Sequence, residues 1–147
     1  MDIYSSEHRS QLMARIHARN TSCELLMRKH LFSLGYRYRL HSKRLPGTPD
    51  IVLPKYKTVI FIHGCFWHGH SDCPIFREPK SNMTFWRKKI LANSVRDAKV
   101  IGKLEMDGWK VIVVWECELR RKSVRDKTLA GIVNEIQDIT SLPGDTM

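Results

Sequence analysis

The sequence predicts a single α/β domain in which a mixed central sheet is flanked by helices. First, residues 110–115 are continuously apolar after Lys110, which is typical of a strand covered on both faces. Second, the apolar stretches 50–53 and 58–62 are joined by a short link, which favours an antiparallel hairpin. Third, three longer segments have helical periodicity and surround these strands. A length of 147 residues suits one domain with one core.

The first predicted helix covers residues 21–34. Thr21 and Glu24 form a capping-box pattern at its start, and Gly35 ends it. Its apolar face is expected to comprise Leu25, Leu26, Leu31, Phe32 and Leu34. Residues 36–40 alternate in polarity and are expected to form a strand.

The predicted hairpin brings two polar residues to the same end of the sheet. Residues 46–49 form a turn of proline and glycine, after which the first strand begins at Asp50. Residues 54–57 interrupt the chain before the second strand, 58–62. Since the start of one strand of an antiparallel hairpin lies beside the end of the other, we expect Asp50 and His63 to be neighbours.

A long helix is predicted over residues 84–107, with Gly108 as its C-terminal stop. Its buried stripe is expected to comprise Ile90, Leu91, Val95, Ala98, Ile101 and Leu104. The apolar strand 110–115 follows, and a closing helix is expected over residues 128–139.

The charge balance indicates a polyanionic partner. Lysine and arginine total 25 against 15 aspartates and glutamates, which gives a formal net charge of +10. Nucleic acid is the commonest partner for such an excess, and a merely basic protein is the alternative. Residues 1–20 are basic and are expected to form either a short surface helix or an arm that orders on DNA, ahead of one domain over 21–147.

The chain is expected to be cytoplasmic. No stretch is apolar for long enough to cross a bilayer, and residues 1–7 lack the layout of a signal peptide. We therefore expect no membrane association and reduced cysteines, for which metal ligation is favoured over disulfides.

Residues 61–73 gather three histidines, two cysteines and two adjacent bulky aromatics. Cys65, His70 and Cys73 have a spacing that one metal ion could gather, and Cys117, just beyond the apolar strand, could be the fourth ligand. Three thiolates and one imidazole suit a closed tetrahedral Zn²⁺ site with a structural role. The alternative is that Cys117 is a packed core thiol and the cluster is accidental.

Four other polar residues suggest chemistry when they are taken together. Asp50 could anchor Mg²⁺ or simply cap a turn, and Glu24 could act in a site or simply complete its capping box. His63 and His68 are left over from the zinc set and are candidates for proton transfer, or surface imidazoles. One carboxylate, a second acid and two imidazoles fit metal-assisted hydrolysis of a phosphodiester.

Two groups of aromatic residues are candidates for DNA contact. Phe66 and Trp67 either fold over the core or form a wedge between stacked bases. Trp86, Lys89 and Asn93 lie at helical spacing on one face of the long helix, where they could stack, hold a phosphate and read a base edge.

At these motifs the chain resembles the very-short-patch repair (Vsr) mismatch endonucleases. The matching segments are 45–50, 60–70, 85–93 and 108–117, and the likeness extends over residues 9–121. The segment 63–68, with its adjacent cysteine, phenylalanine and tryptophan between two histidines, is the most specific of these. The resemblance implies a fold like the PD-(D/E)xK nucleases, with residues 61–63 in place of the usual acid-x-lysine strand.

The resemblance also implies an activity and a set of roles. The expected reaction is a strand-specific nick 5′ to the thymine of a T·G mismatch in double-stranded DNA. Asp50 and the backbone carbonyl of Ile62 would hold Mg²⁺, and His68 would be the general base. Glu24 and His63 would orient water and phosphate. The remaining roles are structural zinc for Cys65, His70, Cys73 and Cys117, intercalation for Phe66, Trp67 and Trp86, and approach to the mismatched pair for Lys89 and Asn93.

Two other functions stay open at this point. A restriction-type nuclease on the same scaffold would cut matched duplex, and a zinc-stabilised DNA-binding module would do no chemistry. The family's better-known members often carry threonine where this chain has Ile62. We expect a monomer, with mismatch-repair proteins as candidate partners.

Overall fold

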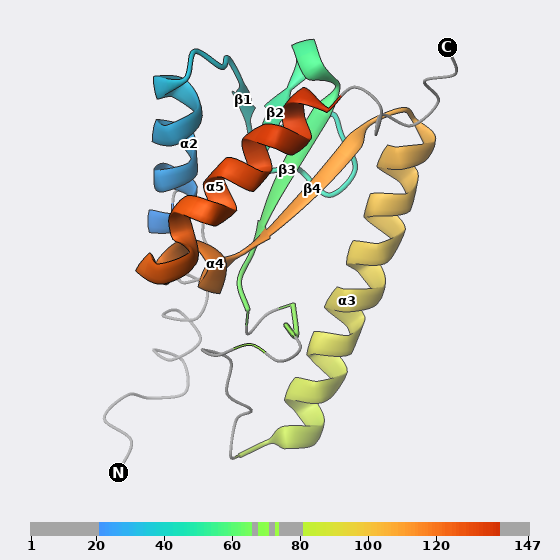
Figure 1. Cartoon of the computed structure of the whole chain (residues 1–147). Coiled ribbons are helices and arrows are strands. Elements are labelled where there is room, and N and C mark those ends of the chain that lie inside the picture. Colours follow the sequence, from blue (N-terminus) through green and yellow to red (C-terminus); the bar gives the residue numbers. More distant parts are fainter. Residues whose placement is uncertain (1–20, 66–67, 71–72, 74–80, 139–147) are drawn as a thin grey trace.

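The computed structural model describes residues 21–65, 68–70, 73 and 81–138. Four strands and four α-helices lie in this part of the chain, together with one 3₁₀ turn (Figure 1). In chain order they are α2 (Ser22–Ser33), β1 (Arg39–Leu40), β2 (Ile51–Leu53), η1 (Pro54–Tyr56), β3 (Thr58–His63), α3 (Met83–Met106), β4 (Lys110–Trp115), α4 (Glu116–Arg120) and α5 (Lys122–Gln137). The expected basic segment 1–20 lies outside the described residues.

The strands form one mixed sheet in the order β1-β2-β3-β4. The predicted hairpin is confirmed, since β2 and β3 pair antiparallel with Ile51 opposite Ile60. β3 and β4 pair parallel, and His63 lies opposite Trp115 at their carboxyl ends. The crossover between β3 and β4 passes through α3, as a parallel pair requires.

Helices cover both faces of the sheet (Figure 1). On one face, α2, α4 and α5 pack against Ile51, Ile60 and Val114 in the larger core. On the other face, α3 contributes Leu104 to a smaller core with Val52, Val59 and Phe61. Apolar side chains alternate between the two cores along β3, which is why this strand is buried along nearly its whole length.

The predicted stripe of α3 is wrong in part. Leu91 is 65% exposed and Val95 48% exposed, and Ala98 is also exposed, whereas Leu104 is buried and Ile90 and Ile101 are half-buried. The face toward the sheet also carries half-buried polar residues, which are Asn93, Ser94 and Asp97. Hydropathy alone therefore predicts in part the wrong side of α3 to face the sheet, because polar residues occupy part of the face that does so.

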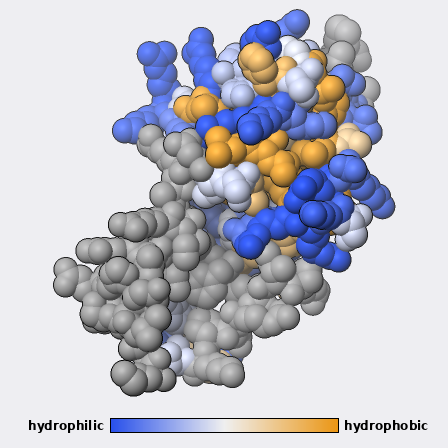
Figure 2. Space-filling view, turned by 90° about the vertical axis from the view of Figure 1, so that its left-hand side faces the viewer, coloured by the Kyte–Doolittle hydropathy of each residue, from blue (hydrophilic) through white to orange (hydrophobic). Residues whose placement is uncertain are grey.

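The apolar face predicted for α2 is also wrong in part. Leu25, Phe32 and Leu34 are exposed, whereas Cys23 and Met27, which the prediction omitted, are buried with Leu31. Figure 2, which shows the side of the molecule that α2 occupies, has hydrophobic surface gathered in its upper part and bordered by hydrophilic side chains.

Two elements differ clearly in extent from the prediction, and one helix was not predicted. The strand expected over 36–40 is only Arg39–Leu40, and the closing helix begins at Lys122 instead of 128. The short helix α4 was not predicted, because five residues are too few to show helical periodicity. No helix in the described ranges combines the length and the apolar character that a membrane span needs.

Candidate active site and metal cluster

Four strand ends meet at one edge of the sheet. β3 and β4 finish there at His63 and Trp115, while β2 starts just after Asp50 and β1 finishes just before His41. A cavity of about 390 Å³ opens at this edge. Its polar lining includes Glu24, His41, Asp50, His63, His68, Arg96 and Asp97.

Glu24, His41 and Asp50 form what we call the carboxylate cluster. One oxygen of Asp50, Oδ2, accepts a hydrogen bond of 2.7 Å from the backbone N–H of Ile62, and the other, Oδ1, lies 4.0 Å from His41 Nε2. His41 Nε2 is also 3.0 Å from Glu24 Oε2, which accepts a 3.0 Å hydrogen bond from Arg28. The cluster is therefore a compact set of oxygen and nitrogen donors at the cavity wall.

The electrostatics of the carboxylate cluster favour a cation. Burial raises the pKa of Asp50 from 3.8 to about 6, and the charge of Glu24 raises it further, against the lowering effects of the Ile62 N–H and of His41. Glu24 is only 5% exposed, so two acids share a space with little water. A bound cation would relieve this crowding of negative charge.

His63 and His68 form a stacked imidazole pair beside the carboxylate cluster. Their ring centroids are 3.9 Å apart and their planes differ by 5°. The edge of His63 meets Trp115, with the ring centroids 5.2 Å apart. This packing fixes both rings in the wall of the cavity.

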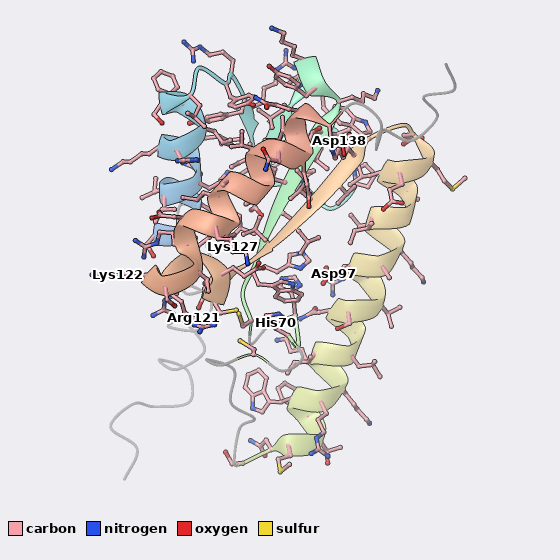
Figure 3. The ribbon with its side chains drawn as sticks, viewed as in Figure 1. His70, Asp97, Arg121, Lys122, Lys127 and Asp138 are labelled. Atoms are coloured by element: carbon pink, nitrogen blue, oxygen red, sulfur yellow. The ribbon has the colours of Figure 1, made fainter. Side chains whose placement is uncertain are left out.

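Asp97 orients His68. Its Oδ2 lies 2.5 Å from His68 Nδ1, and it projects from α3 toward the region below β3 and β4 where His70 also lies (Figure 3). Because an ionised carboxylate only accepts hydrogen bonds, Nδ1 carries the proton and Nε2 keeps its lone pair. The arrangement suits His68 to accept a proton at Nε2.

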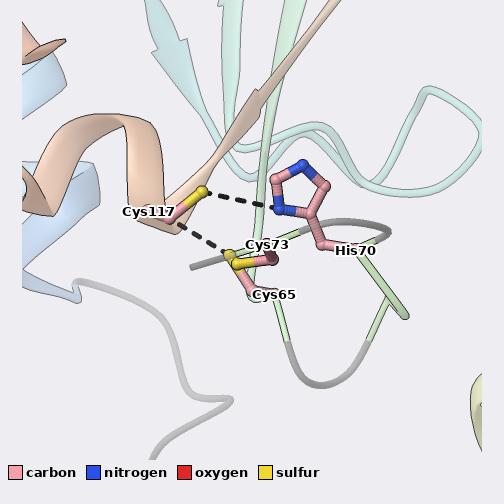
Figure 4. A group of neighbouring side chains, drawn as sticks. All are labelled: Cys65, His70, Cys73 and Cys117. Atoms are coloured by element: carbon pink, nitrogen blue, oxygen red, sulfur yellow. Dashed lines mark hydrogen bonds between the residues drawn. The ribbon is translucent and has the colours of Figure 1, made fainter. Parts of the chain in front are cut away.

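Cys65, His70, Cys73 and Cys117 form a second cluster (Figure 4). Their donor atoms all lie within 4.8 Å of one another. Cys117 Sγ is 3.5 Å from His70 Nδ1, and the Cys117 backbone N–H donates to Cys65 Sγ over 3.4 Å. Cys117 therefore lies beside Cys65, His70 and Cys73 as predicted, and the cluster could hold a metal ion.

Burial raises the pKa of the Cys65 and Cys117 thiols, and the neighbouring Cys73 raises both. Thiolates would be unfavourable in this setting without a compensating charge, which a divalent metal supplies. His70 stacks on Trp115 with ring centroids 4.1 Å apart, so one tryptophan supports both the Cys/His cluster and the imidazole pair.

Two glycines let the loops of the site approach α3. Gly47 has φ +74°, and a Cβ atom there would lie 2.4 Å from Val100 Cγ1. Gly69 has φ +62°, and a Cβ atom there would lie 2.5 Å from Ile90 Cγ2. A larger residue at either position would clash with a side chain of α3 and adopt a strained backbone conformation, so the loop or that side chain would have to shift, and Gly69 lies directly between His68 and His70.

The structure brings together most of the residues that the sequence singled out. Glu24, Asp50, His63 and His68 line the cavity, and Ile62 lines it beside them. Trp86, Lys89 and Asn93 lie on α3 as expected, with Lys89 Nζ 5.9 Å from the Trp86 ring centroid. The roles of all these residues remain predictions. Phe66 and Trp67 lie outside the described residues.

Sequence reasoning missed several side chains of the cavity, and two of them, His41 and Asp97, contact predicted site residues. His41 lies beside Asp50 because β1 pairs with β2, and its backbone N–H donates to the Asp50 carbonyl over 3.2 Å. Asp97 lies four residues after Asn93, so it continues the face of α3 that was predicted to contact DNA. That spacing was a usable signal for Asp97, whereas the position of His41 depended on a strand pairing that the sequence did not specify.

Comparison with known proteins connects this geometry to a family. The family described as "DNA mismatch endonuclease Vsr" matches residues 1–74. The chain is 53% identical over 137 residues to the type II nicking enzyme V.NmeAIP of Neisseria meningitidis, covering 93% of this chain and 97% of that protein. The chain belongs to the Vsr family. It is therefore an endodeoxyribonuclease, as the resemblance in the motifs implied.

Two further Vsr relatives span almost the whole chain. The type II nicking enzyme V.XorIIP of Xanthomonas oryzae pv. oryzae is 47% identical over 133 residues, covering 90% of this chain and 97% of that protein. The DNA mismatch endonuclease Vsr of Escherichia coli is 39% identical over 135 residues, covering 91% of this chain and 86% of that protein. Membership of a DNA-cleaving family accounts for the excess of basic residues.

Proposed function

We propose that this Vsr-family endonuclease uses Mg²⁺ to nick one DNA strand 5′ to the thymine of a T·G mismatch. One observation carries the proposal: a single cavity at the sheet edge holds the Asp50 carboxylate and the stacked imidazoles of His63 and His68. The mixed sheet, with Asp50 beside the end of β3, supports a fold of the PD-(D/E)xK type.

Asp50 and the backbone carbonyl of Ile62 would hold the Mg²⁺ ion. Carboxylate and carbonyl oxygens are the donors that this cation prefers, and the N–H of Ile62 already fixes one oxygen of Asp50. When it is bound, Mg²⁺ polarises the phosphoryl oxygen and stabilises the leaving 3′-oxygen. The raised pKa of Asp50 supports a site built for a cation.

His68 acts as the general base, because Asp97 holds the proton on Nδ1 and directs Nε2 to accept one from water. His63 is fixed against His68 and Trp115, so its ring can orient the phosphate. Glu24, buried and bound to Arg28, lines the same cavity and orients water. His68 can accept a proton only when its ring is neutral, so nicking should fall in acid.

Zinc would occupy the Cys/His cluster in a structural role. In a tetrahedral site, a sulfur at about 2.3 Å and a nitrogen at about 2.0 Å from the ion lie about 3.5 Å apart. The Cys117–His70 separation of 3.5 Å matches that value. Three of the four ligands come from the segment just after β3 and the fourth from α4, so the ion would join this segment to α4, directly after β4, and position His68.

DNA would lie along the site-facing side of α3. Trp86, together with Phe66 and Trp67, would enter the base stack, while Lys89 and Asn93 approach the mismatched pair. Unstacking costs a few kcal/mol and less at a mismatch, so deformability itself favours the T·G site. Residues 1–20 would add phosphate contacts as a basic arm.

A strand-labelled nicking assay tests the proposal. Duplexes that differ only in T·G against C·G are incubated with Mg²⁺ and the wild-type chain, and we expect the thymine strand of the mismatch to be nicked. Asp50→Ala should abolish nicking and keep binding, and Asp126→Ala, which alters an exposed acid on α5, should change neither. Equal nicking of the C·G duplex would indicate a restriction-type nuclease, and full activity of Asp50→Ala would exclude this metal site.

A further inference from the structure

We infer that His41 is a direct ligand of the catalytic cation, and that its nitrogen makes the site prefer Mn²⁺ to Mg²⁺. The inference rests on the proposed function, because it concerns the same site that Asp50 builds. It adds a third donor, an imidazole nitrogen, to a site otherwise made of carboxylate and carbonyl oxygens.

The fold presents His41 to the site through the sheet itself. His41 follows the last residue of β1, and its backbone N–H donates to the carbonyl of Asp50 over 3.2 Å. Its φ of +45° places it in the left-handed region, which is uncommon for residues other than glycine. Only 11% of its side chain is exposed, so the ring is held over the carboxylates instead of extending into water.

The distances within the carboxylate cluster suit ligands of one octahedral ion. With bonds of about 2.1 Å, adjacent donors of such an ion lie about 3.0 Å apart and opposite donors about 4.2 Å apart. His41 Nε2 is 3.0 Å from Glu24 Oε2 and 4.0 Å from Asp50 Oδ1. The separation from Asp50 Oδ1 is close to that of two opposite ligands, whereas the contact with Glu24 is a hydrogen bond, and all three residues line the same cavity.

The net charge of the carboxylate cluster also favours binding of a cation. Arg28 contributes one positive charge against the two negative charges of Glu24 and Asp50, so the set is net negative when His41 is neutral. Arg28 pairs with Glu24 Oε2 and so offsets only one of the two acids. The hydrogen bond to Glu24 places a proton on His41 Nε2 in the metal-free protein, so an ion bound at Nε2 would move that proton to Nδ1 and leave the ring neutral, the form in which histidine binds metals.

A nitrogen donor changes which cation the site prefers. Mg²⁺ favours oxygen ligands, whereas imidazole adds affinity for first-row transition ions, among which Mn²⁺ also accepts carboxylates. Replacing His41 with glutamine would offer an amide oxygen in place of the nitrogen. His41→Gln should therefore weaken Mn²⁺ binding about 10-fold or more and change Mg²⁺ binding by less than about 3-fold.

Electron paramagnetic resonance of bound Mn²⁺ tests the inference without reference to activity. The full chain, loaded with zinc to occupy the Cys/His cluster, is titrated with Mn²⁺, and Mg²⁺ affinity is measured by competition. Electron spin echo modulation should show a directly bound nitrogen in the wild type. When the wild-type protein is made with ¹⁵N-labelled histidine, the nitrogen modulation should change from the ¹⁴N to the ¹⁵N pattern. This part of the test does not depend on the folding of any variant.

Three variants separate the outcomes. His41→Gln should lose the nitrogen signal, and His30→Gln, which alters a histidine on α2 outside the cavity, should keep it. A wild-type protein that binds Mn²⁺ without a nitrogen signal, or a His41→Gln variant that retains the signal, would overturn the role of His41. Asp50→Asn should lose Mn²⁺ altogether. If it binds the ion as the wild type does, the proposed catalytic metal site itself fails.

Discussion

Asp50→Asn should stabilise the metal-free protein while abolishing nicking. Burial raises the pKa of Asp50 from 3.8 to about 6, so the folded state holds the proton of this acid more tightly than the unfolded chain does. Folding stability therefore falls as pH rises through this interval, and the loss is complete above about pH 6. A difference of about two pH units corresponds to about 3 kcal/mol. Since 21% of the side chain is exposed, water screens part of this, and we expect about 2 kcal/mol.

The asparagine variant removes the charge and keeps an oxygen that can accept the Ile62 N–H. Urea unfolding of zinc-loaded protein without Mg²⁺ should show the variant more stable by about 2 kcal/mol at about pH 8, with the difference shrinking toward about pH 4. Thermal midpoints should differ by about 4–8 °C at the higher pH. Added Mg²⁺ should stabilise only the wild type. A variant less stable than the wild type at the higher pH would refute the reasoning.

Two further substitutions test the imidazole pair and the Cys/His cluster. Asp97→Asn should slow single-turnover nicking about 100-fold or more with DNA affinity unchanged, because His68 loses the charged, acceptor-only partner that fixes its tautomer and stabilises the protonated ring. A loss below about 3-fold would exclude this role, and Asp107→Asn at the end of α3 is the matched control. Cys117→Ser should lose bound zinc and lower folding stability by more than about 2 kcal/mol, measured by metal content and urea unfolding. Cys23→Ser, a buried cysteine outside the cluster, should keep its zinc, and retention of zinc by Cys117→Ser would contradict the assignment.

Patterns that depend on near neighbours in the chain were predicted well. The hairpin of β2 and β3 formed with the expected antiparallel pairing, and the Thr21 side chain accepts a hydrogen bond from the Glu24 N–H as its cap pattern required. The three ligands after β3 gathered with the fourth from beyond β4. In each case short chain segments, or the parallel alignment of two strands, restrict the geometry strongly.

The orientation of the helices was predicted less well. Hydropathy placed Leu91 and Val95 in the buried stripe of α3, yet the face toward the sheet carries Asp97. Glu24 fits its cap position and also reaches Arg28 and His41 with a buried carboxylate. Polar residues that serve a site occupy buried positions, so a rule that assigns apolar residues to the interior fails where the chemistry is concentrated.

The sequence by itself determined the chemical inventory of this endonuclease: an acid before a strand, two histidines, four cysteine and histidine side chains that could hold a metal ion, and a family signature around residues 63–68. Only the tertiary structure decided which other side chains complete the cavity. His41 reaches Asp50 through the pairing of β1 with β2, and Asp97 reaches His68 through the way α3 lies across the sheet. Ligand types are fixed by local sequence, whereas strand pairing and helix rotation are set by long-range packing that a single sequence does not record.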